Sequence, residues 1–167
     1  DILYKELHPE QGLEMAVYLG DNYEPTRKIS IQAGLRFSGY AFLGPNQINL
    51  YQPGSELSPS SYVTSLYYEP GSIITRHFNI EPRAAFRFLL GETNSFKVSY
   101  NHNVQYLNLI SYTSVSTPDD IWKLSNPYML PTSCDQFAAG YFQNFSQNAI
   151  EASAEIYYKR LHNLVEY

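Results

Sequence analysis

The fold of this chain is decided by the stretch FNIEPRAAFRFLLGETNSFKVSYNHNVQY, residues 78–106. Apolar and polar side chains alternate along both arms, on either side of the turn-forming segment GETN at residues 91–94. Successive side chains of a strand point to opposite faces, so this alternation predicts an antiparallel β-hairpin. Each arm exceeds the roughly five or six residues of an ordinary strand and reaches the about 9–11 tilted residues that cross a bilayer. The length is the first indication of a membrane-spanning sheet.

The hairpin has one apolar and one charged face. The apolar face carries Phe78, Ile80, Pro82, Ala84, Phe86, Phe88 and Leu90 on the first arm and Phe96, Val98, Tyr100, Val104 and Tyr106 on the second. The other face carries Glu81, Arg83, Arg87 and Lys97. Two residues depart from the pattern. His102 falls on the apolar side and is expected near the wet end of its strand, and Pro82 suggests a bulge because it forfeits a ladder hydrogen bond.

Further strands are predicted at residues 12–20, 28–43, 135–145 and 150–159, although the faces of residues 135–145 are not clear. In the strands with clear faces, every charged residue falls on the polar face. These residues are Glu14, Lys28, Arg36, Glu81, Arg83, Arg87, Lys97, Glu151, Glu155 and Lys159. A Lys or Arg facing lipid at mid-membrane costs about 2–4 kcal/mol. The pattern is therefore typical of a barrel wall that faces a bilayer.

The predicted connections alternate between short and long. The short ones are residues 21–26, 91–94 and 146–149, and the long ones are loops at residues 44–75 and 107–133. Up-and-down strands then place the short turns at one rim and the long loops at the other, as in outer-membrane barrels with periplasmic turns and extracellular loops. The sequence predicts an all-β, antiparallel up-and-down meander of about six strands, forming a partial transmembrane β-barrel.

Composition narrows the class of protein. The chain has 167 residues, a formal net charge of -5 and 16 tyrosines. The acidic balance gives no support for nucleic-acid binding, and tyrosine is enriched where an apolar zone meets water. The single Cys134 excludes an internal disulfide and a multi-cysteine metal site. No run of about 20 apolar residues occurs, so a membrane-spanning helix is excluded, whereas a spanning barrel is not.

The sequence offers no sign of catalysis. It contains no hydrolase elbow, phosphate-binding loop or zinc-ligand spacing, and the histidines are scattered along the chain. Asp119 and Asp120 are adjacent in a loop and do not form a preorganised acid–base pair. We therefore expect a protein that is not an enzyme, with no catalytic residues, no cofactor and no metal.

The candidate functional residues fall into two groups. The aromatic and acidic loop residues Tyr67, Tyr68, Asp119, Asp120 and Trp122 are candidates for ligand or loop contacts. Loop packing or a place in a membrane girdle is the favoured explanation of their aromatic members. The second group is predicted to face the lumen, where opposite charges on adjacent strands can pair or contact a plug. Its members are Glu81, Arg83, Arg87, Lys97, Glu151 and Glu155.

Several motifs resemble the barrel of outer-membrane TonB-dependent receptors. They are EPR at residues 81–83 followed by alternating aromatics, FKVSYN at 96–101, QY at 105–106, TPDDIW at 117–122, Pro131, DQ at 135–136, GYF at 140–142 and EASAEIYYK at 151–159. The likeness extends over residues 13–167 and depends on the order and spacing of loose motifs.

The resemblance implies a large barrel with an N-terminal plug and a TonB box, which imports a scarce nutrient across the outer membrane of a Gram-negative bacterium. The nutrient is a metal chelate, a vitamin or a glycan. The implied partners are the lipid bilayer, the rest of the barrel and its plug, TonB through the N-terminal part, and a surface lipoprotein. This sequence shows no plug, TonB box or signal peptide, and such transporters need roughly 22 strands. We therefore interpret residues 1–167 as a fragment of a receptor barrel domain.

The alternative is a soluble β-sandwich that binds a ligand such as a carbohydrate through its tyrosine-rich loops. The two interpretations differ in which face is covered. In a sandwich the apolar side chains pack against a second sheet, whereas in a barrel they form one continuous outward surface. The diagnostic residues are Phe86, Phe88, Val98, Ala154 and Ile156.

Overall fold

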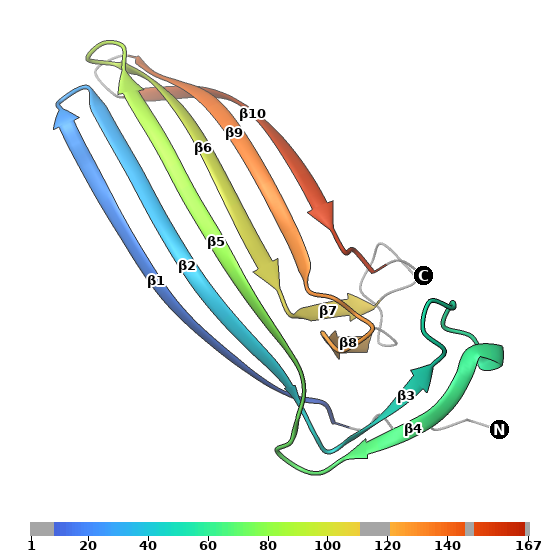
Figure 1. Cartoon of the computed structure of the whole chain (residues 1–167). Coiled ribbons are helices and arrows are strands. Elements are labelled where there is room, and N and C mark those ends of the chain that lie inside the picture. The colour runs from blue at the N-terminus through green and yellow to red at the C-terminus, as the bar shows by residue number, and fades with distance from the viewer. Residues whose placement is uncertain (1–8, 111–120, 146–148, 166–167) are drawn as a thin grey trace.

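Six long strands form one antiparallel sheet in the computed structural model, which describes residues 9–110, 121–145 and 149–165 (Figure 1). They are β1 (Gln11–Thr26), β2 (Ile29–Leu43), β5 (Ile73–Leu89), β6 (Asn94–Gln105), β9 (Thr132–Phe145) and β10 (Ile150–His162). Their order in the sheet, β1-β2-β5-β6-β9-β10, follows the chain. The prediction of an all-β antiparallel meander is confirmed.

The first turn is tighter than predicted. We expected a turn at residues 21–26, but β1 continues to Thr26 and only two residues separate it from β2. A register shift lies between Tyr23 and Thr26, where Pro25 has no N–H to give to the ladder. Beyond the turn, the Ser30 hydroxyl donates to Asn22 Oδ1 at 3.1 Å. The strand therefore continues, with a polar cross-strand contact, through residues whose composition indicated a loop.

The sequence predicted that the two long connections are loops. This prediction was wrong in part, because each connection contains a small hairpin. The first holds β3 (Asn46–Tyr51), a short 3-10 helix (Pro59–Ser61) and β4 (Tyr62–Tyr68), and the second holds β7 (Leu107–Ile110) and β8 (Ile121–Leu124). Both hairpins lie at the end of the sheet opposite the β1–β2 and β5–β6 turns (Figure 1). The strands are too short for periodicity to distinguish them from loops.

A small core fastens these hairpins to the sheet. Its buried hydrophobic members are Tyr40, Phe42 and Tyr106, and Ile48, Ile74, Val104 and Leu124 pack against them. The rings of Tyr40 and Tyr106 stack at 4.7 Å, and the Tyr40 hydroxyl donates to the Ser125 carbonyl at 2.9 Å. The core therefore uses the side of β2 that the sequence assigned to polar residues.

Tyr106 does not lie on the apolar face, as its parity predicted. Its hydroxyl lies 2.8 Å from Ser38 Oγ and accepts a hydrogen bond from Asn79 Nδ2 at 2.9 Å. Strand β6 ends at Gln105, so the alternation no longer holds at the next residue. The bulge predicted at Pro82 is not found, because the β2–β5 register does not shift there. The β5–β6 ladder does end beside it, since Arg83 is the β5 residue nearest to Pro82 that pairs with β6.

Candidate functional site

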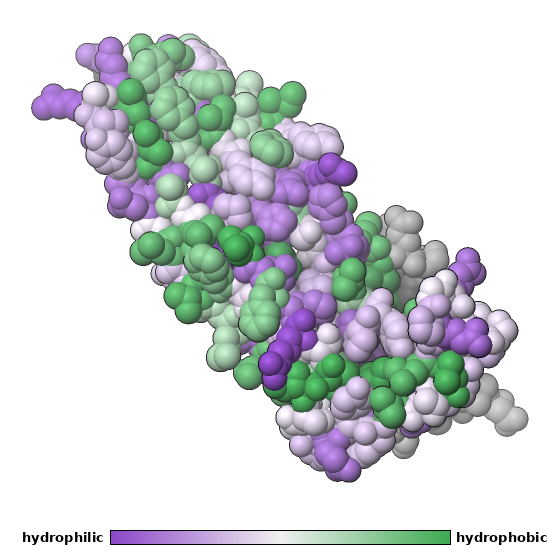
Figure 2. Space-filling view, in the orientation of Figure 1, coloured by the Kyte–Doolittle hydropathy of each residue, from purple (hydrophilic) through white to green (hydrophobic). Residues whose placement is uncertain are grey.

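The most conspicuous feature of the molecule is an exposed apolar face on the six-stranded sheet. Val17 is 73% exposed, Phe78 80% and Ile156 73%. None of the five diagnostic side chains is buried, and no second sheet of the described residues covers them. Hydrophobic side chains are exposed in several places on the sheet, beside hydrophilic ones, in the view of Figure 2. An unpartnered apolar area of this extent is unusual for a soluble monomer.

This face forms a band that crosses the strands obliquely. On β1 its apolar members are Leu13, Met15, Val17 and Leu19, and on β10 they are Ile150, Ala152, Ala154, Ile156 and Tyr158. The middle of the β1 set is level with Ser38 and, through it, with Asn79 of β5. The middle of the β10 set, Ala154, is level with Phe88 of β5. Between the edge strands the band therefore shifts by about nine residues along the strands.

The shift corresponds to a definite strand tilt. At about 3.3 Å per residue it amounts to roughly 30 Å, and five steps between strands of about 4.8 Å cover roughly 24 Å. The strands would then be inclined by about 50° to the normal of a flat apolar layer, close to the about 35–45° of transmembrane barrels.

Charged residues of the same face lie at the edges of the band. Asp21 of β1 bounds it towards the turns. Arg76 of β5 bounds it towards the hairpins, as do Asp135 of β9 and Arg160 of β10, which are paired across the ladder. Asp21 was predicted to lie in a turn and Asp135 in a strand without clear faces, whereas Arg76 and Arg160 lie just outside the predicted strands. Between these charged positions, the uncharged part of the face is the oblique band.

His102 lies at this hairpin-side edge, in a polar cluster with Asp135. One Asp135 oxygen accepts the Tyr100 hydroxyl at 2.7 Å and lies 2.8 Å from His102 Nδ1. The other lies 3.3 Å from His162 Nε2. Three strands contribute to the cluster, which the sequence did not predict because the faces of β9 were unclear.

The opposite face of the sheet is polar and centres on Arg36. Its guanidinium lies 2.9 Å from Glu14 and 3.4 Å from Glu81, so it joins β1, β2 and β5. Glu81 is only 1% exposed, and its Oε1 has no hydrogen-bond partner among the described residues. The sequence placed all three residues on the polar face but did not predict this triad.

The other predicted lumen residues share this face through the register. Arg83 donates to Asn103 Oδ1 at 3.1 Å. Arg87 is directly opposite Lys97, so this pair consists of like charges and is not one of the opposite-charge pairs that the lumen face could form. A hollow of about 300 Å³ near the turns is lined by Arg87, Lys97 and Glu151. Glu155 lies at the same level as Lys97, two strands away, with Gly140 of β9 between them. Arg87 and Lys97 are both exposed, and the high dielectric constant of water weakens the repulsion between exposed charges.

The predicted loop contacts are divided between the two hairpins. Tyr67 and Tyr68 lie on β4, whereas Trp122 lies on β8 opposite Leu109 and is 59% exposed. Asp119 and Asp120 lie outside the described residues. The described members of this set do not converge on one pocket.

In residues 9–110, 121–145 and 149–165, no helix has the length and hydrophobicity to cross a membrane. Over the same residues, no group of three or more His, Cys, Asp or Glu side chains is arranged to hold a metal ion. Comparison with protein-family models, with curated proteins and with solved structures found no match for the chain.

Proposed function

We propose that the chain forms part of the wall of a transmembrane β-barrel in the outer membrane of a Gram-negative bacterium. The observation that carries the proposal is the oblique apolar band, which has no covering layer among the described residues. Lipid tails stabilise such a band, and the slant is what tilted barrel strands require. The barrel is of the TonB-dependent receptor type, which imports a scarce nutrient such as a metal chelate, a vitamin or a glycan.

The polar face then lines the lumen. Charges that would be costly against lipid are retained there, with Arg36 bridging Glu14 and Glu81 across three strands. The two hairpins mark the extracellular rim, because outer-membrane barrels have short periplasmic turns and longer extracellular loops. A plug inside the barrel is a partner for this face, and TonB and a surface lipoprotein act through other parts of the receptor.

The sheet requires further strands on both sides. In the described sheet, β1 pairs only with β2 and β10 only with β9, which leaves a long free edge on each. An unpaired backbone edge cannot remain in a bilayer, because nothing there hydrogen-bonds to it. The rest of the barrel supplies the missing strands. A soluble sandwich is not proposed, because it needs a second layer over the apolar face.

Tryptophan quenching by brominated lipid tests the proposal. Trp122 is the single tryptophan, so Trp122→Phe provides a background without tryptophan. Ile156→Trp and Glu155→Trp then place one probe on each face of β10, at adjacent positions. In vesicles whose acyl chains carry bromine, we expect strong quenching of the Ile156 probe and weak quenching of the Glu155 probe. Equal quenching of the two probes would exclude a bilayer-facing wall.

A further inference from the structure

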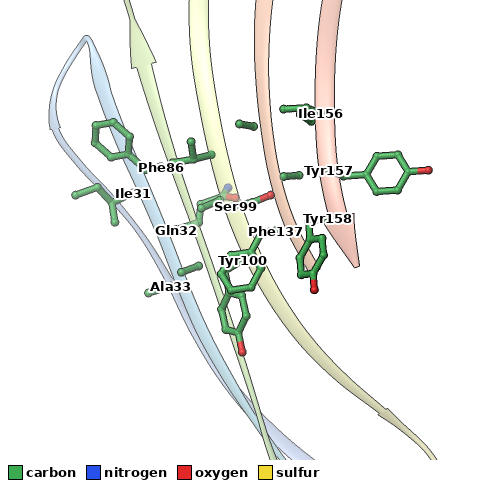
Figure 3. A pocket seen from close by; sticks show the side chains of 15 residues that line it. Ile31, Gln32, Ala33, Phe86, Ser99, Tyr100, Phe137, Ile156, Tyr157 and Tyr158 are labelled. Carbon is green, nitrogen blue, oxygen red and sulfur yellow. The ribbon is translucent and has the colours of Figure 1, made fainter. Parts of the chain in front are cut away.

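The apolar face carries a groove of about 800 Å³ across β2, β5, β6, β9 and β10 (Figure 3). Its floor includes the small side chains of Ala33 and Ala84, which pair across β2 and β5. Larger side chains flank the floor, namely Phe86, Tyr100, Phe137 and Tyr158. Volumes of about 300–1,000 Å³ are typical of ligand sites. The groove is therefore large enough for an apolar ligand.

One end of the groove is polar. Tyr100, which lines it, donates to Asp135 at 2.7 Å. Asp135 and its ladder partner Arg160 belong to the next rung of the same face beyond Phe137 and Tyr158. At about 3.3 Å per residue, that rung lies roughly 7 Å along the strands. An occupant of the groove thus meets charged groups at its hairpin-side end.

The Asp135 carboxylate and the Arg160 guanidinium in this rung differ in whether they already have hydrogen-bond or ion-pair partners. Asp135 already contacts Tyr100, His102 and His162. Arg160 is exposed and has no hydrogen-bond or ion-pair partner among the described residues. A guanidinium has five N–H donors in a planar fork that matches a phosphate. The group left free to bind a ligand is therefore the cationic guanidinium of Arg160, which has His162 beside it.

The backbone under the groove excludes a peptide strand as the occupant. Strands β5, β6 and β9 lie inside the sheet and pair on both sides along the groove. Their N–H and C=O groups are used by the ladders, so a peptide could not add there as a strand. An acyl chain has no hydrogen bonds to satisfy and needs only apolar contact.

We propose that this groove binds an anionic lipid, with an acyl chain along the alanine floor and a headgroup phosphate on Arg160 beside His162. The inference rests on the proposed bilayer-facing wall. It goes further by assigning one lipid a defined site with a preferred headgroup.

Lipid retention tests the site. The protein is taken from vesicles that contain equal amounts of phosphatidylglycerol and phosphatidylcholine with the same acyl chains, and bound lipid is counted by native mass spectrometry. We expect phosphatidylglycerol to be retained roughly tenfold better. Both phosphates can accept hydrogen bonds from Arg160, but the ammonium of phosphatidylcholine cancels the net negative charge that attracts the guanidinium. Arg160→Gln should abolish the preference. Lys159→Gln removes the same charge from the other face, where Lys159 lies over the Tyr157 ring, and should preserve it.

Ala84→Phe gives an independent test, because it fills the floor of the groove and should reduce retention of both lipids. Equal retention of the two lipids by the unaltered protein, or equal effects of Arg160→Gln and Lys159→Gln, would overturn the site. The Ile156 and Glu155 probes are measured in separate samples, because Ile156 itself lines the groove. A strongly quenched probe without selective retention refutes the lipid site alone, whereas an unquenched probe refutes both the site and the wall.

Discussion

Arg36 shows at the scale of one residue how the polar face is organised. It has partners on both neighbouring strands, but they are not equivalent: Glu14 is half-exposed, whereas Glu81 is buried. Water replaces a lost partner of Glu14 at little cost. A buried carboxylate has no such replacement, so the ion pair is sensitive to the loss of its cation.

We predict that Arg36→Met is far more destabilising than either substitution of its partners. It leaves Glu81 buried and unpaired, which typically costs about 3–5 kcal/mol. Glu81→Gln leaves Arg36 with Glu14, and Glu14→Gln removes only an exposed pair worth about 0–1 kcal/mol. The urea midpoints of unfolding in detergent micelles measure the difference. Similar midpoints for Arg36→Met and Glu14→Gln would contradict the assigned burial of Glu81.

Tyr106, which directly follows β6, hydrogen-bonds to β2 and β5 at a level where the β5–β6 ladder has already ended. We predict that Tyr106→Phe lowers the free energy of unfolding by about 1–3 kcal/mol, because its hydroxyl bonds both Ser38 and Asn79 out of contact with water. Tyr67→Phe is the matched control, since Tyr67 is 64% exposed. Its effect should stay within about 0.5 kcal/mol. The same urea titration compares the two variants.

Among the elements, the β3–β4 hairpin depends most on a single backbone position. Gly44 N–H donates to the Ser72 carbonyl at 2.9 Å, and the Gly44 carbonyl accepts from Gly71 N–H at 2.9 Å. A Cβ on Gly44 would meet the Glu69 carbonyl oxygen. The base of this hairpin is therefore closed by backbone hydrogen bonds of Gly44, beside which the Ser72 hydroxyl donates to the Glu69 carbonyl at 2.6 Å.

We predict that Gly44→Ala opens this hairpin and costs about 1–3 kcal/mol, the usual cost of overpacking. Gly54→Ala tests the tip of the same hairpin, where φ is +79° but no atom lies within 4 Å of the added Cβ. It should cause only the smaller loss of a strained turn residue. Hydrogen exchange at the amides of β3 reports the opening. If exchange there is faster in Gly54→Ala than in Gly44→Ala, the close approach is not what holds the hairpin.

For the whole molecule, the governing feature is a sheet that turns its hydrophobic side outward. Its buried core is small and fastens the hairpins, so packing within the described residues does not account for the exposed face. The oblique course of the band adds a geometric requirement that a solvent-exposed sheet does not have. Both features are accounted for if lipid covers the band and further strands pair with its edges.

We predict that Val17→Lys makes the free energy of folding into vesicles less favourable by about 2–4 kcal/mol, because it places a charge in the middle of the β1 part of the band. Ala16→Lys is its control, at the adjacent residue on the other face and opposite the uncharged Ser38, and is expected to cost little. The fraction folded is measured as protease-protected protein at equilibrium in urea. An equal loss for the two variants would show that neither face meets lipid.

The sequence alone predicted six of the strands, their antiparallel order and the face of most charges, because a strand repeats every two residues whatever surrounds it. Tertiary structure decided the rest. The hairpins in the long connections, the position of Tyr106 and the Arg36 triad depend on contacts between residues far apart in the chain. The slant of the apolar band is set by the register of all five strand pairs, which the sequence does not specify. Periodicity assigns a residue to a face, but only pairing sets its level in the sheet.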